Sequence, residues 1–153
     1  YLNLEKNINA NTYNRLQKRI DNTKNILQLL LRHIDVEDII AYGASTKGNI
    51  VLNHCDITSD QIKYVCDSNP DKFGKYTPGS NLEIISKDKM REINPKYLLI
   101  LIWSFRKEVI MQEESYINNG GVLIFHLPIL HIVDKNNYKK VLNDRISTLS
   151  FEM

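Results

Sequence analysis

The residues with the clearest chemical potential lie in one short turn, which has the sequence Gly-Ala-Ser-Thr-Lys-Gly-Asn and starts at Gly43. An apolar run ends at Gly43 and an apolar-periodic segment follows Gly48, a pattern typical of a buried strand that turns into a helix. Glycines let the backbone approach a ligand, and the first N–H groups of a helix attract anions. Lys47 could meet a phosphate as a point charge, and Ser45 and Thr46 could donate hydroxyl hydrogen bonds. The turn therefore predicts a phosphate site. The alternative is a plain tight turn with a solvated lysine.

The sequence of this turn excludes two familiar nucleotide-binding motifs. Gly43 and Gly48 give G-x-x-x-x-G, but the next residues are Asn-Ile, where a Walker P-loop needs Lys and Ser or Thr. The pair Ala44-Ser45 replaces the second glycine of the dinucleotide fingerprint G-x-G-x-x-G. The turn is neither an NTPase loop nor a standard dinucleotide fingerprint.

Three other polar or aromatic residues end predicted strands, and the carboxyl ends of parallel strands share one ligand-binding edge. Asp67 lies 24 residues after Gly43 and could accept hydrogen bonds from a ribose or cap its own turn. Trp103 could stack on a ligand or simply belong to the core. His126 could touch a ligand, although a core or rim histidine is the favoured interpretation.

No catalytic or metal-ligating set is visible in the sequence. There is no H-E-x-x-H motif, no paired carboxylates, and no serine or cysteine in a nucleophile context beside a histidine. Cys55 and Cys66 match no zinc spacing and are too few for a disulfide framework, so we expect two buried, reduced thiols.

The elements that must hold these residues alternate between strand and helix. Strand patterns cover residues 39–42, 62–67, 82–85, 97–102 and 122–127, and helical patterns cover 12–34, 48–55, 87–92 and 105–118. This alternation predicts an α/β fold with a Rossmann-like, doubly wound, mostly parallel five-stranded sheet, flanking helices and a long N-terminal helix. We expect a single domain over residues 1–153, made of an arm (1–11), the long helix (12–34), an α/β core (38–133) and a tail or terminal helix (134–153).

Two segments raise functional questions of their own. The helix at 12–34 carries one apolar face through Leu16, Ile20 and Leu27, so it either covers the sheet or packs against a missing partner. The shorter helix expected at residues 48–55 turns Ile50, Val51 and Leu52 inward. The turn-rich segment 68–80 is long enough to be functional or disordered.

Composition bounds the class of protein. The chain has 153 residues, 42% hydrophobic and 25% charged, with a formal net charge of +2. These values suit a soluble globular domain and argue against a nucleic-acid or membrane-surface protein. No stretch reaches the roughly 18 to 20 apolar residues of a membrane span. We expect a cytoplasmic protein, and a start without Met is compatible with a fragment of something longer.

Several segments together resemble the C-terminal domain of the sugar C-methyltransferases. Residues 42–49 are similar to the family's Gly-Tyr-Gly-Ala-x-x-Lys-Gly-Asn stretch. Further segments fall in the same order and at similar spacing, at residues 67–72, 74–79, 99–103 and 120–128. The resemblance covers roughly residues 12–133, and the ordered set is more specific than any single motif.

The resemblance implies both an activity and a division of labour. Members usually join a cysteine-rich zinc domain, an S-adenosylmethionine-binding domain and this Rossmann-like domain, and they methylate a carbon of a nucleotide-activated deoxysugar through an enolate. This chain would bind the nucleotide-sugar, while a companion domain or protein carries S-adenosylmethionine. The implied substrate contacts are Gly43, Ala44, Lys47, Gly48 and Asn49, with Asp67, Asn69, Lys72, Tyr76 and Trp103 as looser candidates.

The departures from that family limit what the chain does alone. The sequence lacks the zinc and methyl-donor domains, and Leu127-Pro-Ile replaces the family's common Leu-Pro-Glu. We therefore expect no cofactor and no methyl transfer in the isolated chain, which would serve carbohydrate or polysaccharide biosynthesis as part of a methyltransferase. Two alternatives stay open. One is a stand-alone NAD(P)- or nucleotide-binding oxidoreductase with Asp67 on the ribose. The other is a non-catalytic module that dimerises or captures a partner through residues 12–34.

Overall fold

The computed structural model describes residues 10–143 and has the expected α/β architecture, built on one sheet in the order β3-β2-β1-β4-β5-β6. Neighbouring strands from β3 to β5 run parallel, and only the last pair is antiparallel. The strands are β1 (Ile39–Tyr42), β2 (Tyr64–Asp67), β3 (Glu83–Ser86), β4 (Tyr97–Ile100), β5 (Val122–Phe125) and β6 (His131–Val133). The predicted fold class is confirmed. Residues 1–9 of the predicted arm and residues 144–153 of the predicted tail lie outside the described residues.

The sheet has one strand more than the sequence predicted. β6 pairs antiparallel with β5, with His131 opposite Phe125 and Val133 opposite Leu123. It is only three residues long and follows Pro128, which had marked the end of the last predicted strand. A three-residue segment is too short to show the period-two alternation that identifies a strand.

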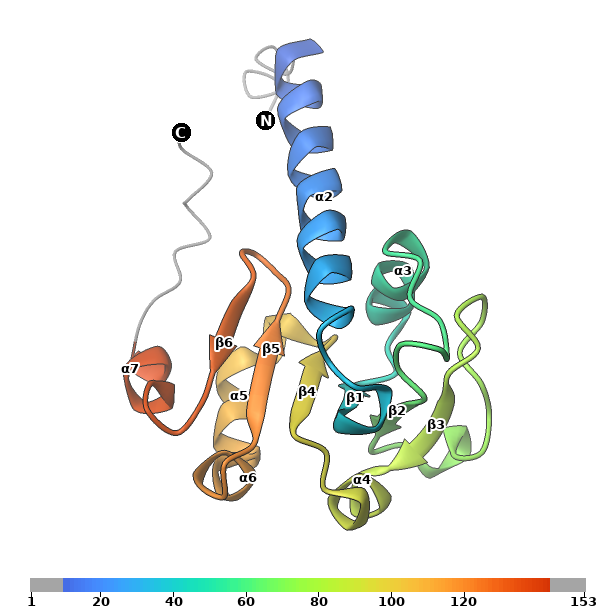
Figure 1. Cartoon of the computed structure of the whole chain (residues 1–153), viewed down its shortest axis with the longest axis vertical. Coiled ribbons are helices and arrows are strands. Elements are labelled where there is room, and N and C mark those ends of the chain that lie inside the picture. The colour runs from blue at the N-terminus through green and yellow to red at the C-terminus, as the bar shows by residue number, and fades with distance from the viewer. Residues whose placement is uncertain (1–9, 144–153) are drawn as a thin grey trace.

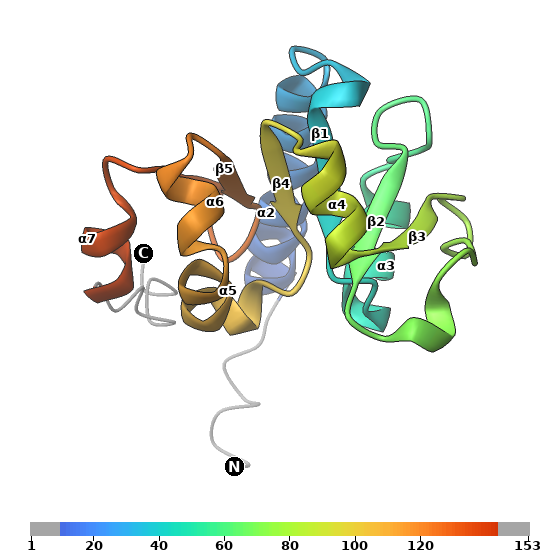
Figure 2. The same cartoon turned by 90° about the horizontal axis from the view of Figure 1, so that it is seen from below.

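Helices cover both faces of this sheet (Figures 1 and 2). On one face lie the long helix α2 (Ala10–Leu31) and α3 (Thr46–His54). The other face carries α4 (Lys87–Ile93), α5 (Arg106–Gln112), α6 (Glu114–Asn118) and α7 (Tyr138–Asn143). Short 3-10 turns complete the connections, namely η1 (Val36–Asp38), η2 (Pro70–Lys72) and η3 (Trp103–Phe105). None of the helices within residues 10–143 is both long and apolar enough to cross a membrane.

The core forms two apolar layers, one on each side of the sheet. Along β1, Ile39 and Ala41 face α2 and α3, while Ile40 and Tyr42 face α4, α5 and α6. All four are at most 1% exposed. Burying an aliphatic side chain of this size contributes about 1.5 to 3 kcal/mol, so the strand is anchored from both faces. The turn that follows Tyr42 therefore starts from a fixed point.

Two helical expectations need correction, and one prediction on the cysteines is confirmed. The predicted helix 105–118 is interrupted at Glu113, whose carboxylate is buried against Tyr42. The buried face of α3 consists of Gly48 and Leu52 and continues to Cys55 just after the helix. Ile50, which was expected to face inward, is exposed. Both cysteines are free and buried, as expected.

Candidate functional site

The turn after β1 needs glycine at its first position. Gly43 has φ +96°, and a Cβ there would lie 2.6 Å from Cγ2 of Ile102. Its N–H donates to the carbonyl of Cys66 at 2.8 Å, which ties the turn to the end of β2. Both the left-handed backbone and the close approach exclude a side chain at this position.

The start of α3 is built by a serine cap and a second glycine. Ser45 is the N-cap, and its Oγ accepts a hydrogen bond from the Gly48 N–H at 3.0 Å. A Cβ on Gly48 would lie 2.7 Å from Cβ of Leu101, so this glycine allows α3 to pack closely on the end of β4. The N–H groups of Thr46 and Lys47 belong to the first turn, where a helix offers no carbonyl four residues earlier. They are available to an incoming anion.

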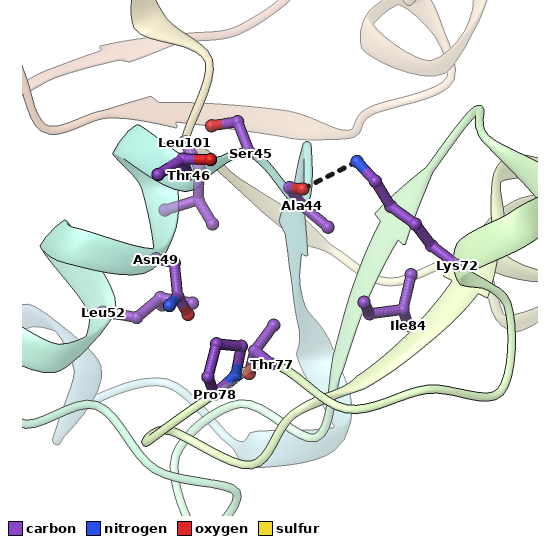
Figure 3. Close-up of a pocket in the computed structure, with 10 residues that line it drawn as sticks. All are labelled: Ala44, Ser45, Thr46, Asn49, Leu52, Lys72, Thr77, Pro78, Ile84 and Leu101. Atoms are coloured by element: carbon purple, nitrogen blue, oxygen red, sulfur yellow. Dashed lines mark hydrogen bonds between the residues drawn. The ribbon is translucent and has the colours of Figure 1, made fainter.

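A carboxylate and an ammonium group clamp the turn from the side of β2. Asp67 Oδ2 accepts hydrogen bonds from the Ala44 N–H at 2.9 Å and from Lys72 Nζ at 3.2 Å. Its Oδ1 accepts the Asn69 N–H at 2.9 Å. Lys72 Nζ also donates to the Ala44 carbonyl at 2.9 Å, as Figure 3 shows. With both oxygens engaged and an 11% exposed side chain, Asp67 acts here as the clamp of the turn.

The turn-rich segment after β2 is packed into a hairpin beside β3. Gly74 N–H donates to the Ile84 carbonyl, and Thr77 N–H donates to the Leu82 carbonyl. At the tip, Asn53 Nδ2 of α3 donates to the Pro78 carbonyl at 3.0 Å. The segment is therefore a fixed wall, because it is bonded to the sheet on one side and to α3 on the other.

These three pieces enclose a pocket of about 260 Å³ (Figure 3). Its floor is apolar and belongs to the core between the sheet and the α2–α3 layer. The lining residues are Ala44, Ser45, Thr46, Asn49, Leu52, Lys72, Thr77, Pro78, Ile84 and Leu101. The side-chain oxygen of Asn49 is buried and has no hydrogen-bond partner among the described residues. A buried acceptor without a partner costs stability, so a ligand donor at this point would be favoured.

Some of the predicted site residues line the pocket, others shape the turn or an adjacent cap, and the rest lie elsewhere. Ala44, Ser45, Asn49 and Lys72 line the pocket. Gly43, Gly48 and Asp67 shape the turn without lining the pocket, and Asn69 caps η2 by accepting the Asp71 N–H.

The remaining predicted residues lie outside the pocket lining. Lys47 and Tyr76 are exposed on the surface. Trp103 packs with the α4–α6 layer on the other side of the sheet, where its ring meets His126 edge-on at 5.2 Å between centroids. The structure thus brings Lys72, and not Lys47, to the pocket as its cationic side chain.

The sequence led us to expect that the loop of residues 68–80 closes over the ligand, but it did not identify three residues that form the opposite wall of the pocket. Thr77 and Pro78 come from the hairpin, and Ile84 comes from the strand that the hairpin joins. The hairpin could have been inferred from Gly74 and Gly79, because glycines are typical of tight reversals, and the structure gives both a positive φ.

A second polar cluster lies on the opposite face of the sheet, directly behind the turn. Tyr42 Oη donates to Glu113 Oε1 at 2.8 Å, and Arg91 donates to the same oxygen at 3.2 Å. Burial and the adjacent Glu113 carboxylate raise the pKa of Tyr42 far above its usual range, so the phenol stays protonated. The cluster holds the end of β1. No three side chains of the metal-ligating types converge anywhere in residues 10–143.

Comparison with known proteins agrees with the resemblance seen in the sequence. Residues 2–128 match the model of the family described as "C-methyltransferase C-terminal domain". The chain is also 34% identical over 94 residues to C-methyltransferase NovU from Streptomyces niveus, which covers 61% of this chain and 22% of that relative. The chain thus aligns with about a fifth of the relative's length. From its strand order, its turn and this match over most of its length, the chain belongs to the C-methyltransferase C-terminal domain family.

Proposed function

We propose that this chain holds a nucleotide-sugar for methyl transfer by a separate S-adenosylmethionine-binding domain. The observation that carries the proposal is the preformed pocket beside the N-terminus of α3, with an unpaired acceptor buried in its wall. Ligands of open α/β sheets bind at the carboxyl ends of the strands, which is where this pocket opens.

Each part of the pocket suits one part of such a ligand. The first-turn amides of α3 provide positive potential for a phosphate. Lys72 Nζ is paired with Asp67 and bonded to the Ala44 carbonyl, and its third N–H is the one that can reach the phosphate. Asn49 Oδ1 can accept a hydrogen bond from an N–H of a base or an O–H of a sugar. Pro78 and Ile84 offer an apolar surface to the face of a ring, while Leu52 and Leu101 lie beneath it at 0% exposed.

The size of the pocket indicates how much of the ligand this chain contacts. At about 260 Å³ it lies below the roughly 300 to 1,000 Å³ of pockets that enclose whole drug-sized ligands. It suits one ring-sized portion, so the remainder of a nucleotide-sugar would extend out of it. A companion domain would then meet the exposed sugar, and holding two reactants in register can supply a large part of a barrier reduction.

A dinucleotide is the competing ligand, since the strand order 3-2-1-4-5-6 is that of dinucleotide-binding domains. Two contacts weigh against it. Asp67, in the place of the ribose-binding carboxylate, already has both oxygens engaged. Ser45 stands in the place of the second glycine, and its hydroxyl oxygen already accepts a hydrogen bond from the Gly48 N–H. Both features reduce what the turn can offer a pyrophosphate and a ribose.

Titration calorimetry of the chain with nucleoside diphosphates and nucleotide-sugars of different bases tests the proposal. We expect binding that weakens about fivefold to tenfold in Asn49→Leu, because the variant loses one hydrogen bond to a buried acceptor. The matched control is Asn118→Leu, at an exposed position of α6 outside the pocket, which should bind like the unmodified chain.

Two outcomes would count against the proposal. The first is no binding at millimolar ligand by a chain whose circular dichroism shows an intact fold. The second is binding of NADH with none of the nucleotide-sugars, which would favour the dinucleotide alternative.

A further inference from the structure

Helix α2 is buried over only part of its length, although its apolar face runs through most of it. Leu27 and Leu31 are 0% and 3% exposed and pack on the core between α3 and the sheet. On the same face, at steps of three and four residues, Tyr13, Leu16 and Ile20 are 64%, 50% and 36% exposed. We call these three side chains the α2 stripe. Figure 1 shows this half of α2 standing clear of the rest of the described fold.

Contacts with α3 show where the packed half of the helix ends. Gln28 donates to the carbonyl of Cys55, and Lys24 pairs with Asp56 just beyond α3. Within residues 10–143 no hydrogen bond or ion pair joins the stripe to another element, and side-chain bonds beside it run along the helix, from Gln17 to Asp21 and from Thr23 to the Arg19 carbonyl. Most of the stability of a helix in a protein comes from packing of its apolar face, so an apolar face that continues past the packed half indicates a further partner.

We propose that the α2 stripe docks the methyl-donor portion of a C-methyltransferase, on a surface that is apolar at its centre and acidic at its rim. The family match from residue 2 to residue 128 includes the whole of α2, so the helix belongs to the unit that the family shares. The relative matched by this chain is far longer than the matched segment, so a C-methyltransferase has other parts that must meet this one.

Charge separates this partner from a second copy of the chain. Residues 10–23 carry Arg15, Lys18 and Arg19 against Asp21 as the one carboxylate in that sequence. Two copies paired through this segment would bring a net +2 against a net +2, which opposes association at moderate salt. A surface rimmed with carboxylates has the opposite effect, since it attracts the segment and sets its orientation.

The proposal rests on the proposed function for the identity of the partner, but its test needs no nucleotide. The probe is the methyl-donor portion of the C-methyltransferase from the same organism, added as a separate polypeptide to the 153-residue chain. We expect a complex that the double variant Leu16→Gln, Ile20→Gln weakens at least tenfold, because two apolar anchors are lost. Affinity should also fall as salt rises.

The matched control is Leu29→Gln, because Leu29 is as exposed as the stripe, at 57%, but lies on the opposite face of the same helix. It should change the affinity less than twofold. All these positions are exposed, so the melting temperatures of the variants should stay within a few degrees of the parent chain.

Three results would overturn the proposal. One is no complex with the methyl-donor portion, or a complex that the double variant leaves unchanged. Another is a dimer of the chain alone in analytical ultracentrifugation that the double variant dissociates, since a second copy would then be the occupant. The third is slow amide exchange over residues 13–20 in the isolated monomer, which would mean that the chain covers its own stripe. Failure of nucleotide-sugar binding, measured separately on the unmodified chain and on Asn49→Leu, would leave the docking result standing.

Discussion

The two faces of the sheet beside the Gly43 turn differ in how their polar groups are paired. On the face covered by α4, α5 and α6, Tyr42, Glu113 and Arg91 satisfy one another in a closed network. On the face covered by α3, the turn borders a pocket in which the Asn49 oxygen has no partner among the described residues. The same strand end thus carries a closed polar network on one side and an open polar pocket on the other.

This difference indicates a division between support and recognition. The closed side fixes the end of β1, and a turn that starts from a fixed point can present its amides and the Asn49 side chain in one geometry. Preorganised polar groups lose less free energy on binding than mobile ones. Variants of the closed side should therefore change stability, whereas variants of the open side should change binding.

The largest expected effect concerns His126, which borders the closed side through its contact with Trp103. The ring is 1% exposed, and burial lowers the pKa of His126 to about 4. Because the unfolded chain protonates near pH 6.5, stability is fully present above that pH and falls as the pH drops toward 4, by about 3 kcal/mol from this group. Urea unfolding at pH 7.5 and pH 4.5 measures the loss.

The variant His126→Leu is the control for this titration. It should keep most of the stability at pH 7.5 and lose much of the acid sensitivity. Some should remain, since burial also lowers the pKa of His131. An unchanged pH profile in the variant would contradict the role of His126.

The next effect tests the network itself. Glu113→Ala removes the 2% exposed carboxylate that accepts from Tyr42 and Arg91, and leaves a buried phenol with one acceptor fewer. We expect a loss of about 2 to 3 kcal/mol, at the low end for a buried pair because the Arg91 side chain is about half exposed and can return to water. Thermal unfolding measures it. Glu92→Ala on the exposed side of α4 is the control and should change little.

A smaller effect is expected where the two sides meet at α3. Gly48→Ala places a Cβ about 2.7 Å from Leu101, so α3 must shift away from β4 at a cost of about 1 to 2 kcal/mol. Because Leu101 also lines the pocket, nucleotide-sugar affinity should fall as well. A variant with unchanged stability and affinity would show that α3 is not seated as closely as the structure has it.

The smallest effect compares two lysines of the open side. Lys72→Gln should weaken binding of a nucleoside diphosphate about tenfold at low salt, since its ammonium group lines the pocket and holds the Ala44 carbonyl. Lys47→Gln should weaken binding only about twofold, because that side chain is exposed and contributes a screened charge. The reverse order would restore the prediction made from the sequence, in which Lys47 meets the phosphate.

The fold class could be predicted because each buried strand and each turn is marked by residues that are adjacent in the sequence. Apolar runs such as those at 39–42 and 97–100 are long enough to mark buried strands, and glycines mark the turn after β1. β6 was missed because three residues carry no periodicity. The break at Glu113 was missed because the partner of its buried carboxylate is Tyr42, 71 residues earlier in the chain, which leaves no local signal.

The site could be predicted on the side of the turn and, through the family resemblance, at Lys72. Ala44, Ser45 and Asn49 follow directly from the strand-to-helix pattern and do line the pocket. The opposite wall depends on how the hairpin folds back onto α3 through Asn53 and Pro78, a contact between distant segments that no local spacing encodes. For the same reason, the sequence could not tell which of two nearby lysines reaches the pocket.

The most direct test of the proposed function is nuclear magnetic resonance mapping of a nucleotide-sugar on the ¹⁵N-labelled chain. The amides of Ala44 to Asn49, Lys72 and Thr77 should shift in a saturable manner, while those of Arg91, Trp103 and Glu113 should shift little. Saturable shifts centred on Trp103 and His126, or no shifts at millimolar ligand in a folded chain, would contradict it.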